Sequence, residues 1–146
     1  MSETISQLSL QDLDELQNLL QSSMLPAEDC AEQADHIYAL YRQGRMLAAG
    51  GLEPASPYLL LRSVVVGVDQ RGQGLGERMT RFLIAQARQA NCPAIYLLTE
   101  TAQAYFQRFG FSAVDRDRVP FPIKQTRQFS GLCPDTAVCM VLPLSP

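Results

Sequence analysis

The residues best suited to chemistry form a glycine-rich run, Gln70-Arg71-Gly72-Gln73-Gly74-Leu75-Gly76, followed directly by Glu77. The run separates an apolar stretch typical of a buried strand from a stretch with helical periodicity. The first backbone N–H groups of a helix have no internal partners, and the helix dipole adds positive charge there. Because glycines have no Cβ, a phosphate or pyrophosphate can reach these amides, and Arg71 adds a charged donor. The run therefore predicts an anion-binding loop.

Two well-known phosphate loops do not match this run. A P-loop needs a lysine and then Ser or Thr after its last glycine, and neither is present. A dinucleotide fingerprint needs glycine at position 77, where Glu77 stands. Glu100 lies about where a ribose-binding acid is expected, but one strand-helix-strand unit in so short a chain cannot form the two-halved dinucleotide fold.

The elements that must hold this loop predict an α/β domain spanning residues 1–146. A central strand precedes the loop at 58–68, an amphipathic helix follows it to Ala90, and a second buried strand covers 94–98. The remaining predicted elements are strands at 4–6, 37–41, 46–52, 111–114 and 136–142, with helices at 10–20, 26–33 and 101–110. We expect a central mixed β-sheet flanked by helices on both faces.

Composition excludes several classes of protein. The 146 residues are 47% hydrophobic and 18% charged, which is typical of one globular domain. A net charge of −3 argues against nucleic acid as a partner. The chain has no apolar run long enough to span a bilayer, and its first residues do not resemble a signal peptide, so we expect a cytoplasmic protein without a membrane partner. The four cysteines and His36 show no metal-ligand spacing, so we expect free thiols and no metal.

Two motifs together carry a resemblance to a known family. Arg71, Gly74 and Gly76 fit the pattern R-x-x-G-x-G, and about thirty residues later the segment 102–111 ends in Gly-Phe. In this order they resemble the GNAT family of N-acetyltransferases, and the similarity covers nearly the whole chain. The resemblance implies a GNAT-like fold and acetyl-CoA as co-substrate, with its pyrophosphate on the glycine-rich loop and its pantetheine paired to the strand Val64-Val65-Val66. It also implies a small-molecule amine as acceptor, direct attack in a ternary complex, and a possible homodimer.

Further segments resemble the GNAT subgroup associated with arsenic-resistance operons. They include Leu61-Arg62-Ser63 and Leu132-Cys133-Pro134. The segment 119–134 is also distantly similar to the acetyltransferase domain of N-acetylglutamate synthase. Both resemblances imply an amino acid or an amino-acid-like compound as the acceptor.

The sequence departs from the family at position 106. Many members have a tyrosine four residues before the Gly-Phe glycine, where it protonates the departing thiolate, but this chain has Phe106 with Tyr105 beside it. Adjacent helical residues point about 100° apart, so Tyr105 does not simply replace the missing acid. We expect Tyr105 and Phe106 to pack in the core or to line the acyl pocket. The departure leaves a non-catalytic CoA-binding sensor or regulatory protein as an alternative function.

Glu53 and Arg62 are the candidate catalytic residues, with Glu100 as an alternative to Glu53. A protonated amine must lose a proton before it attacks a thioester, and either Glu53 or Glu100 can accept that proton, directly or through water. We favour Glu53, because the arsenic-associated subgroup usually has threonine where Glu100 stands. Arg62 interrupts a strand that should be buried, so it needs an anionic partner. That partner is either an internal acid such as Glu53 or the carboxylate of the acceptor, and both alternatives stay open.

Overall fold

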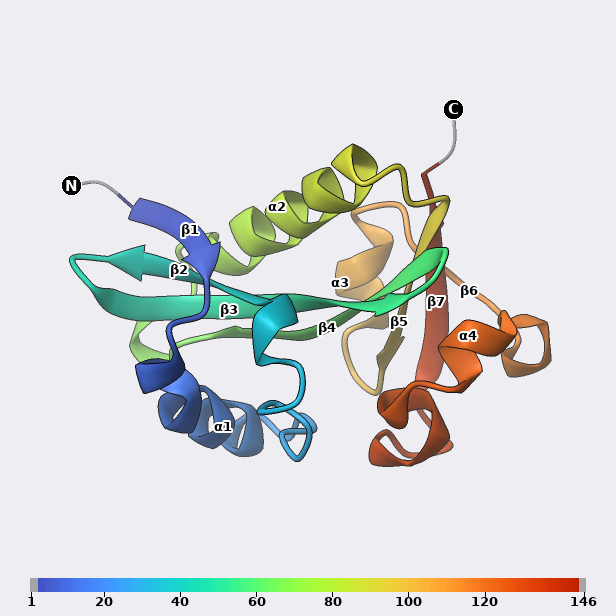
Figure 1. Ribbon diagram of the computed structural model, residues 1–146, viewed down its shortest axis with the longest axis horizontal. Helices are drawn as coiled ribbons and strands as arrows, with labels where there is room; N and C mark the ends of the chain where they lie inside the picture. Colours follow the sequence, from blue (N-terminus) through green and yellow to red (C-terminus); the bar gives the residue numbers. More distant parts are fainter. Residues whose placement is uncertain (1–2, 145–146) are drawn as a thin grey trace.

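A mixed seven-stranded sheet runs through the protein in the order β1-β2-β3-β4-β5-β7-β6. The computed structural model describes residues 3–144 (Figure 1), so Met1 and Ser2, part of the stretch compared with signal peptides, lie outside it. Neighbouring strands are antiparallel except β4 and β5, which are parallel. The strands are β1 (Glu3–Gln7), β2 (Ile37–Arg42), β3 (Arg45–Ala55), β4 (Tyr58–Val66), β5 (Ala94–Thr99), β6 (Ser112–Ala113) and β7 (Val138–Pro143).

Helices cover both faces of this sheet. They are α1 (Leu13–Ser22), α2 (Leu75–Gln89), α3 (Gln103–Gln107) and α4 (Phe121–Lys124), with a π-helical turn, η5, at Gln128–Leu132. Figure 1 shows α2 and α3 on one face and α1 and α4 on the other. Met79 and Leu83 of α2 anchor one core, and Leu16 and Leu20 of α1 anchor another. The expected mixed sheet with helices on both faces is therefore confirmed. No helix among residues 3–144 is long and apolar enough to cross a membrane.

Two local predictions before the central strand are wrong. The segment 26–33 is not a helix but a series of turns, closed in part by a hydrogen bond from the Gln33 N–H to the Asp29 carbonyl of 3.1 Å. The sequence Ser9-Leu10-Gln11-Asp12 has the form of a capping box, but Ser9 makes no side-chain cap, and its backbone N–H donates to the Tyr41 hydroxyl at 2.9 Å. Both segments contact distant strands, Ser9 through Tyr41 of β2 and Asp29 through Arg62 of β4.

Candidate active site

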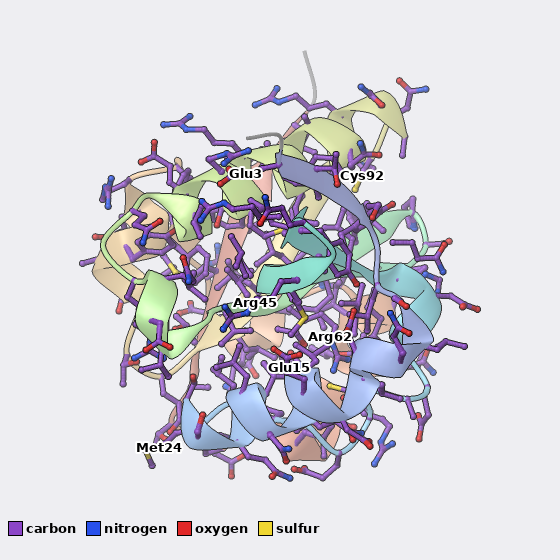
Figure 2. All side chains as sticks on the ribbon, turned by 90° about the vertical axis from the view of Figure 1, so that its left-hand side faces the viewer. Glu3, Glu15, Met24, Arg45, Arg62 and Cys92 are labelled. Carbon is purple, nitrogen blue, oxygen red and sulfur yellow. The ribbon has the colours of Figure 1, made fainter. Side chains whose placement is uncertain are left out.

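The parallel strands β4 and β5 separate shortly after they meet. Their register contains only two pairs, Leu59 with Ile95 and Leu60 with Tyr96. Beyond these pairs a cavity of about 550 Å³ lies between β4 and the end of β5. It extends from the interior, where Figure 2 shows Arg62, to the edge of the molecule, where the same view shows Met24. The separation leaves main-chain groups of both strands facing a space that can hold a ligand.

A β-bulge on β4 directs the strand along this cavity. Ala49 of β3 pairs with Val65, whereas Gly51 pairs with Arg62, so two residues of β4, Ser63 and Val64, lie opposite Gly50. Ser63 has a φ of 60°, a conformation that is unusual for a residue with a side chain. A bulge of this kind bends its strand and redirects the side chains around it. The predicted pantetheine strand, Val64 to Val66, lines the cavity directly after the bulge.

The glycine-rich loop leads into the first turn of α2, as the sequence predicts. Gly74 is the N-cap residue with a φ of 78°, and Gly72 has a φ of 82°. A Cβ built on either glycine would meet no atom within 4 Å, so the loop is open on that side. At Gly76, which lines the cavity, a Cβ would come within 3.3 Å of the Tyr105 hydroxyl. The conformations and the space around these glycines fit a bound anion.

The other predicted residues of the loop have different surroundings. Arg71 lines the cavity, and its Nη2 donates to the Ser23 hydroxyl at 3.2 Å. The side chain of Leu75 is buried in the core. Glu77 pairs with two exposed arginines, Arg81 on α2 and Arg108 after α3. The side chains of Leu75 and Glu77 stabilise the fold, so these residues can contribute only their backbone N–H groups to an anion. The side chain of Gln73 is exposed.

Arg62 forms a buried triad with two carboxylates. Its Nη1 donates to Asp29 Oδ2 at 2.6 Å and to Glu53 Oε1 at 2.7 Å, and its Nη2 donates to Asp29 Oδ1. Its Nε lies 3.2 Å from the Ser63 hydroxyl. Burial alone would lower the pKa of the Arg62 guanidinium, but hydrogen bonds and charge from Asp29 and Glu53 outweigh burial and raise that pKa above its ordinary value. Internal pairing, one of the two alternatives for Arg62, is confirmed.

The second acid of the triad, Asp29, was not predicted. Its carboxylate is almost fully buried, with 1% of the side chain exposed, although the residue belongs to an irregular segment. The only sequence signal was the charge at position 62, because a buried guanidinium needs more than one acceptor to satisfy its five N–H groups. That signal shows that a second acid is required but does not identify it.

The two candidate bases lie in different environments. Glu53 is buried, bonds to Arg62 and is not among the residues that line the cavity. Glu100, at the carboxyl end of β5, is exposed and lines the cavity. A base needs access to the proton that it removes. This geometry favours Glu100, whereas the sequence favoured Glu53.

The aromatic pair on α3 borders the cavity. Phe106 is buried and packs edge-to-face against Tyr105 and Phe111, with ring centroids 5.1 and 5.8 Å apart. Tyr105 also lines the cavity, and its hydroxyl lies 3.4 Å from the Thr80 hydroxyl on α2. Phe106 thus supplies an apolar wall, and the Tyr105 hydroxyl is directed toward the first turns of α2.

Cys133 is the one cysteine that lines the cavity among residues 3–144. Burial, assisted by the negative charge of Glu100, raises the pKa of its thiol to about 11. At neutral pH this side chain is therefore an uncharged thiol. No group of three or more potential metal-binding side chains occurs in the described part of the chain.

Comparisons with known proteins agree with this geometry. Residues 5–111 match the acetyltransferase (GNAT) family model. The amino-acid acetyltransferase of Escherichia coli K12 is 28% identical over 100 residues, which is 67% of this chain and 23% of that protein. The chain thus spans about a quarter of the length of this curated relative.

Solved structures share the fold. N-acetylglutamate synthase from Neisseria gonorrhoeae, in complex with coenzyme A and N-acetyl-glutamate, aligns with a TM-score of 0.84 and 17% identity over 100% of this chain and 36% of its own. The ribosomal-protein-S18-alanine N-acetyltransferase of E. coli aligns with a TM-score of 0.72 and 20% identity, over 99% of this chain and 96% of its own. With the family model matched over most of its residues, the chain belongs to the GNAT family of acetyltransferases.

Proposed function

We propose that this protein transfers the acetyl group of acetyl-CoA to the amine of a small molecule, an amino acid or an amino-acid-like compound. The observation that carries the proposal is the continuity of the cavity between β4 and β5 with the glycine-led N-terminus of α2. A cavity with free main-chain groups along one wall and an anion site at one end suits a long ligand with amide groups and a pyrophosphate. The amino-acid acceptor is supported by the relatives named above.

Acetyl-CoA, when bound, supplies an activated acetyl group as a thioester. The chain's own residues bind and orient the co-substrate. Backbone N–H groups at the start of α2, together with Arg71, hold the pyrophosphate, and Val64 to Val66 present main-chain groups to the pantetheine. Phe106 closes the apolar side of the cavity. Holding an amine against a thioester in this way makes the reaction effectively unimolecular, which accounts for most of the rate.

Glu100 receives the proton of the attacking amine in this proposal, directly or through a water molecule. The new bond joins the amine nitrogen to the acetyl carbonyl carbon, and the carbon–sulfur bond breaks. No side chain is required to protonate the sulfur, because a thiol with a pKa near 8–9 leaves readily as a thiolate. Phe106 at the position of the family's usual tyrosine is therefore compatible with catalysis.

The decisive experiment measures thiol release from acetyl-CoA in the presence of a panel of amines, with acetyl-CoA binding followed separately by calorimetry. The panel holds amino acids and amines, and also phosphinic and arsonic amino-acid analogues, because of the resemblance to the arsenic-associated subgroup. An acetyltransferase releases one thiol for each amide formed. A CoA-binding sensor, the alternative, binds the co-substrate and releases no thiol with any amine.

A further inference from the structure

Gln128 is a buried residue whose side-chain amide has no protein partner in the described part of the chain and is accessible from the cavity. Gln128 begins the π-helical turn η5 and is 4% exposed, and it lines the cavity. Its side chain makes no hydrogen bond with any residue from 3 to 144, whereas the equally buried Thr126 hydroxyl donates to the Ile123 carbonyl at 2.8 Å. Among residues 3–144 the enclosed side-chain polar atom that lacks a partner is Gln33 Oε1, so the Gln128 amide is not enclosed but opens to the cavity. A small number of polar groups directed into a mostly apolar cavity is what orients a bound ligand.

Gln128 belongs to the acceptor end of this cavity. The main-chain carbonyl of Gln128 accepts a hydrogen bond of 3.0 Å from the N–H of Cys133, and the charges of Glu100, Arg62, Arg116 and Asp29 all act on the Cys133 thiol. Arg71 belongs to the opposite end, before the N-terminus of α2. The amide is therefore placed where an acceptor amine must approach, away from the anion loop.

The acceptor end carries an excess of negative charge. Among the described residues that line the cavity, the charged ones are Arg62, Arg71 and Glu100. The positive charge of Arg62 faces two buried carboxylates, Asp29 and Glu53, and its side chain has no exposed surface. The triad thus contributes a net charge of about −1, and Glu100 adds another of the same sign. A protonated amine is stabilised in such a site, and a desolvated carboxylate is not.

Two nearby arginines do not reverse this charge. Arg127 is paired with Glu32. Arg116 donates to the neutral carbonyls of Pro134 and Ala137 while its guanidinium lies over the Phe129 ring, so it keeps its positive charge and reduces the net charge of this region to about −1 without reversing its sign. Neither arginine lines the cavity. A free carboxylate on the acceptor would therefore lose water without gaining a cationic partner.

We infer, resting on the proposed function, that the acceptor carries a protonated amine and an uncharged hydrogen-bonding group, as in an α-amino amide, and that Gln128 binds this uncharged group. The amide nitrogen of Gln128 donates to the carbonyl of the acceptor, and Glu100 attracts the ammonium group. Gln128 is then a specificity-determining residue that favours an amino-acid amide over the free amino acid.

The experiment uses matched sets of three acceptors that differ only at the carboxyl position. For alanine, leucine and phenylalanine, the set is the free amino acid, its primary amide and the decarboxylated amine. Thiol release from acetyl-CoA gives kcat and KM for each. With the unmodified protein we expect kcat/KM to be at least about tenfold higher for the amide than for the free acid, the scale of one hydrogen bond plus one unfavourable charge.

Variants test the role of Gln128 directly. Gln128→Leu should raise KM for the amide about tenfold, leave KM for the decarboxylated amine and the affinity for acetyl-CoA unchanged, and leave the melting temperature equal or higher. Gln128→Arg should shift the preference toward the free acid. Gln125→Leu, the same change at an exposed position of the same segment, should alter none of these values.

Each contrary result has a distinct meaning. If the unmodified protein uses the free acids as well as the amides, or if Gln128→Leu lowers activity on all three acceptors together with the melting temperature, the inference is wrong and the proposed function stands. If no member of any set releases thiol while acetyl-CoA still binds, the proposed function itself is wrong.

Discussion

Removing the buried guanidinium of Arg62 is the most informative perturbation of this fold. Arg62→Met keeps most of the side-chain volume but leaves Asp29 and Glu53 as carboxylates in a site where their side chains are 1% and 10% exposed. Breaking a buried ion pair by removing one partner costs about 3–5 kcal/mol. The variant should therefore be much less stable than the unmodified protein, although it loses no apolar packing.

This cost converts to a shift in melting temperature. Unfolding entropy is about 2.1 cal/mol/K per residue, so a chain of 146 residues loses roughly 3 °C for each kcal/mol. Arg62→Met should thus melt about 10–16 °C earlier than the unmodified protein. The same substitution at Arg127, whose exposed pair with Glu32 is worth at most about 1 kcal/mol, should cost no more than about 3 °C.

Calorimetric melts of both variants provide the assay, and a rescue variant identifies the cause. Adding Asp29→Asn and Glu53→Gln to Arg62→Met removes the unpaired charges and should recover at least half of the loss, because neutral amides are less costly to bury. Equal melting temperatures for Arg62→Met and Arg127→Met would refute the charge-balance argument. If activity falls only on acceptors with a carboxylate, Arg62 binds the acceptor, whereas internal pairing predicts equal losses on all acceptors.

Three further predictions concern the cavity. Gly74→Ala and Gly44→Ala both place a Cβ at a φ near +75°, with no atom within 4 Å, so both should lose similar stability. Only Gly74→Ala should weaken acetyl-CoA binding, by at least tenfold in calorimetric titration; equal affinities would exclude the loop from the co-substrate site. The thiol of Cys133 has a pKa of about 11 in place of 9.0, so it should react with iodoacetamide about 100-fold more slowly than an ordinary thiol at pH 8. Its reaction rate should rise about tenfold for each pH unit up to about pH 11, and a rate that does not change with pH would contradict this prediction. Glu100→Gln should lower kcat by about 10²–10⁴ at pH 7, whereas Glu53→Gln should mainly lower the melting temperature. The reverse pattern would restore Glu53 as the base.

The loop and its helix could be predicted because their signals are local. Glycines at 72 and 74 adopt positive φ, the amphipathic repeat from Leu75 gives α2, and each feature depends on residues within one turn. The bulge at Ser63 has no such signal, since serine has no strong preference for its φ of 60°. Its conformation is imposed by the register between β3 and β4, which involves residues more than ten positions apart.

The buried triad of Arg62, Asp29 and Glu53 also depends on a contact between distant residues, which the sequence does not reveal. The sequence indicated that Arg62 needs an anion, and Glu53 was a natural choice because a hairpin brings β3 beside β4. Asp29 reaches the guanidinium from a segment that was predicted to be helical, 33 positions earlier in the chain. A charged residue within an apolar strand predicts that an acid must lie beside it. Which distant acid this is depends on how the segment 26–33 packs against the sheet, and the sequence does not show that.

The two-pair contact between β4 and β5 has a mechanical consequence. The sheet has two parts, one made of β1 to β4 and the other of β5, β7 and β6. Within the described residues, β4 and β5 pair only at Leu59–Ile95 and Leu60–Tyr96, near the start of both strands. In the empty protein, side-chain packing holds the two parts together beyond this contact, since one buried core includes Leu47 of β3, Leu97 of β5 and Met140 of β7. A ligand with main-chain-like amides that paired with both strands would join the two parts, so its binding would also stabilise the sheet. Hydrogen exchange at Val64 to Val66, measured with and without acetyl-CoA, would report this stabilisation.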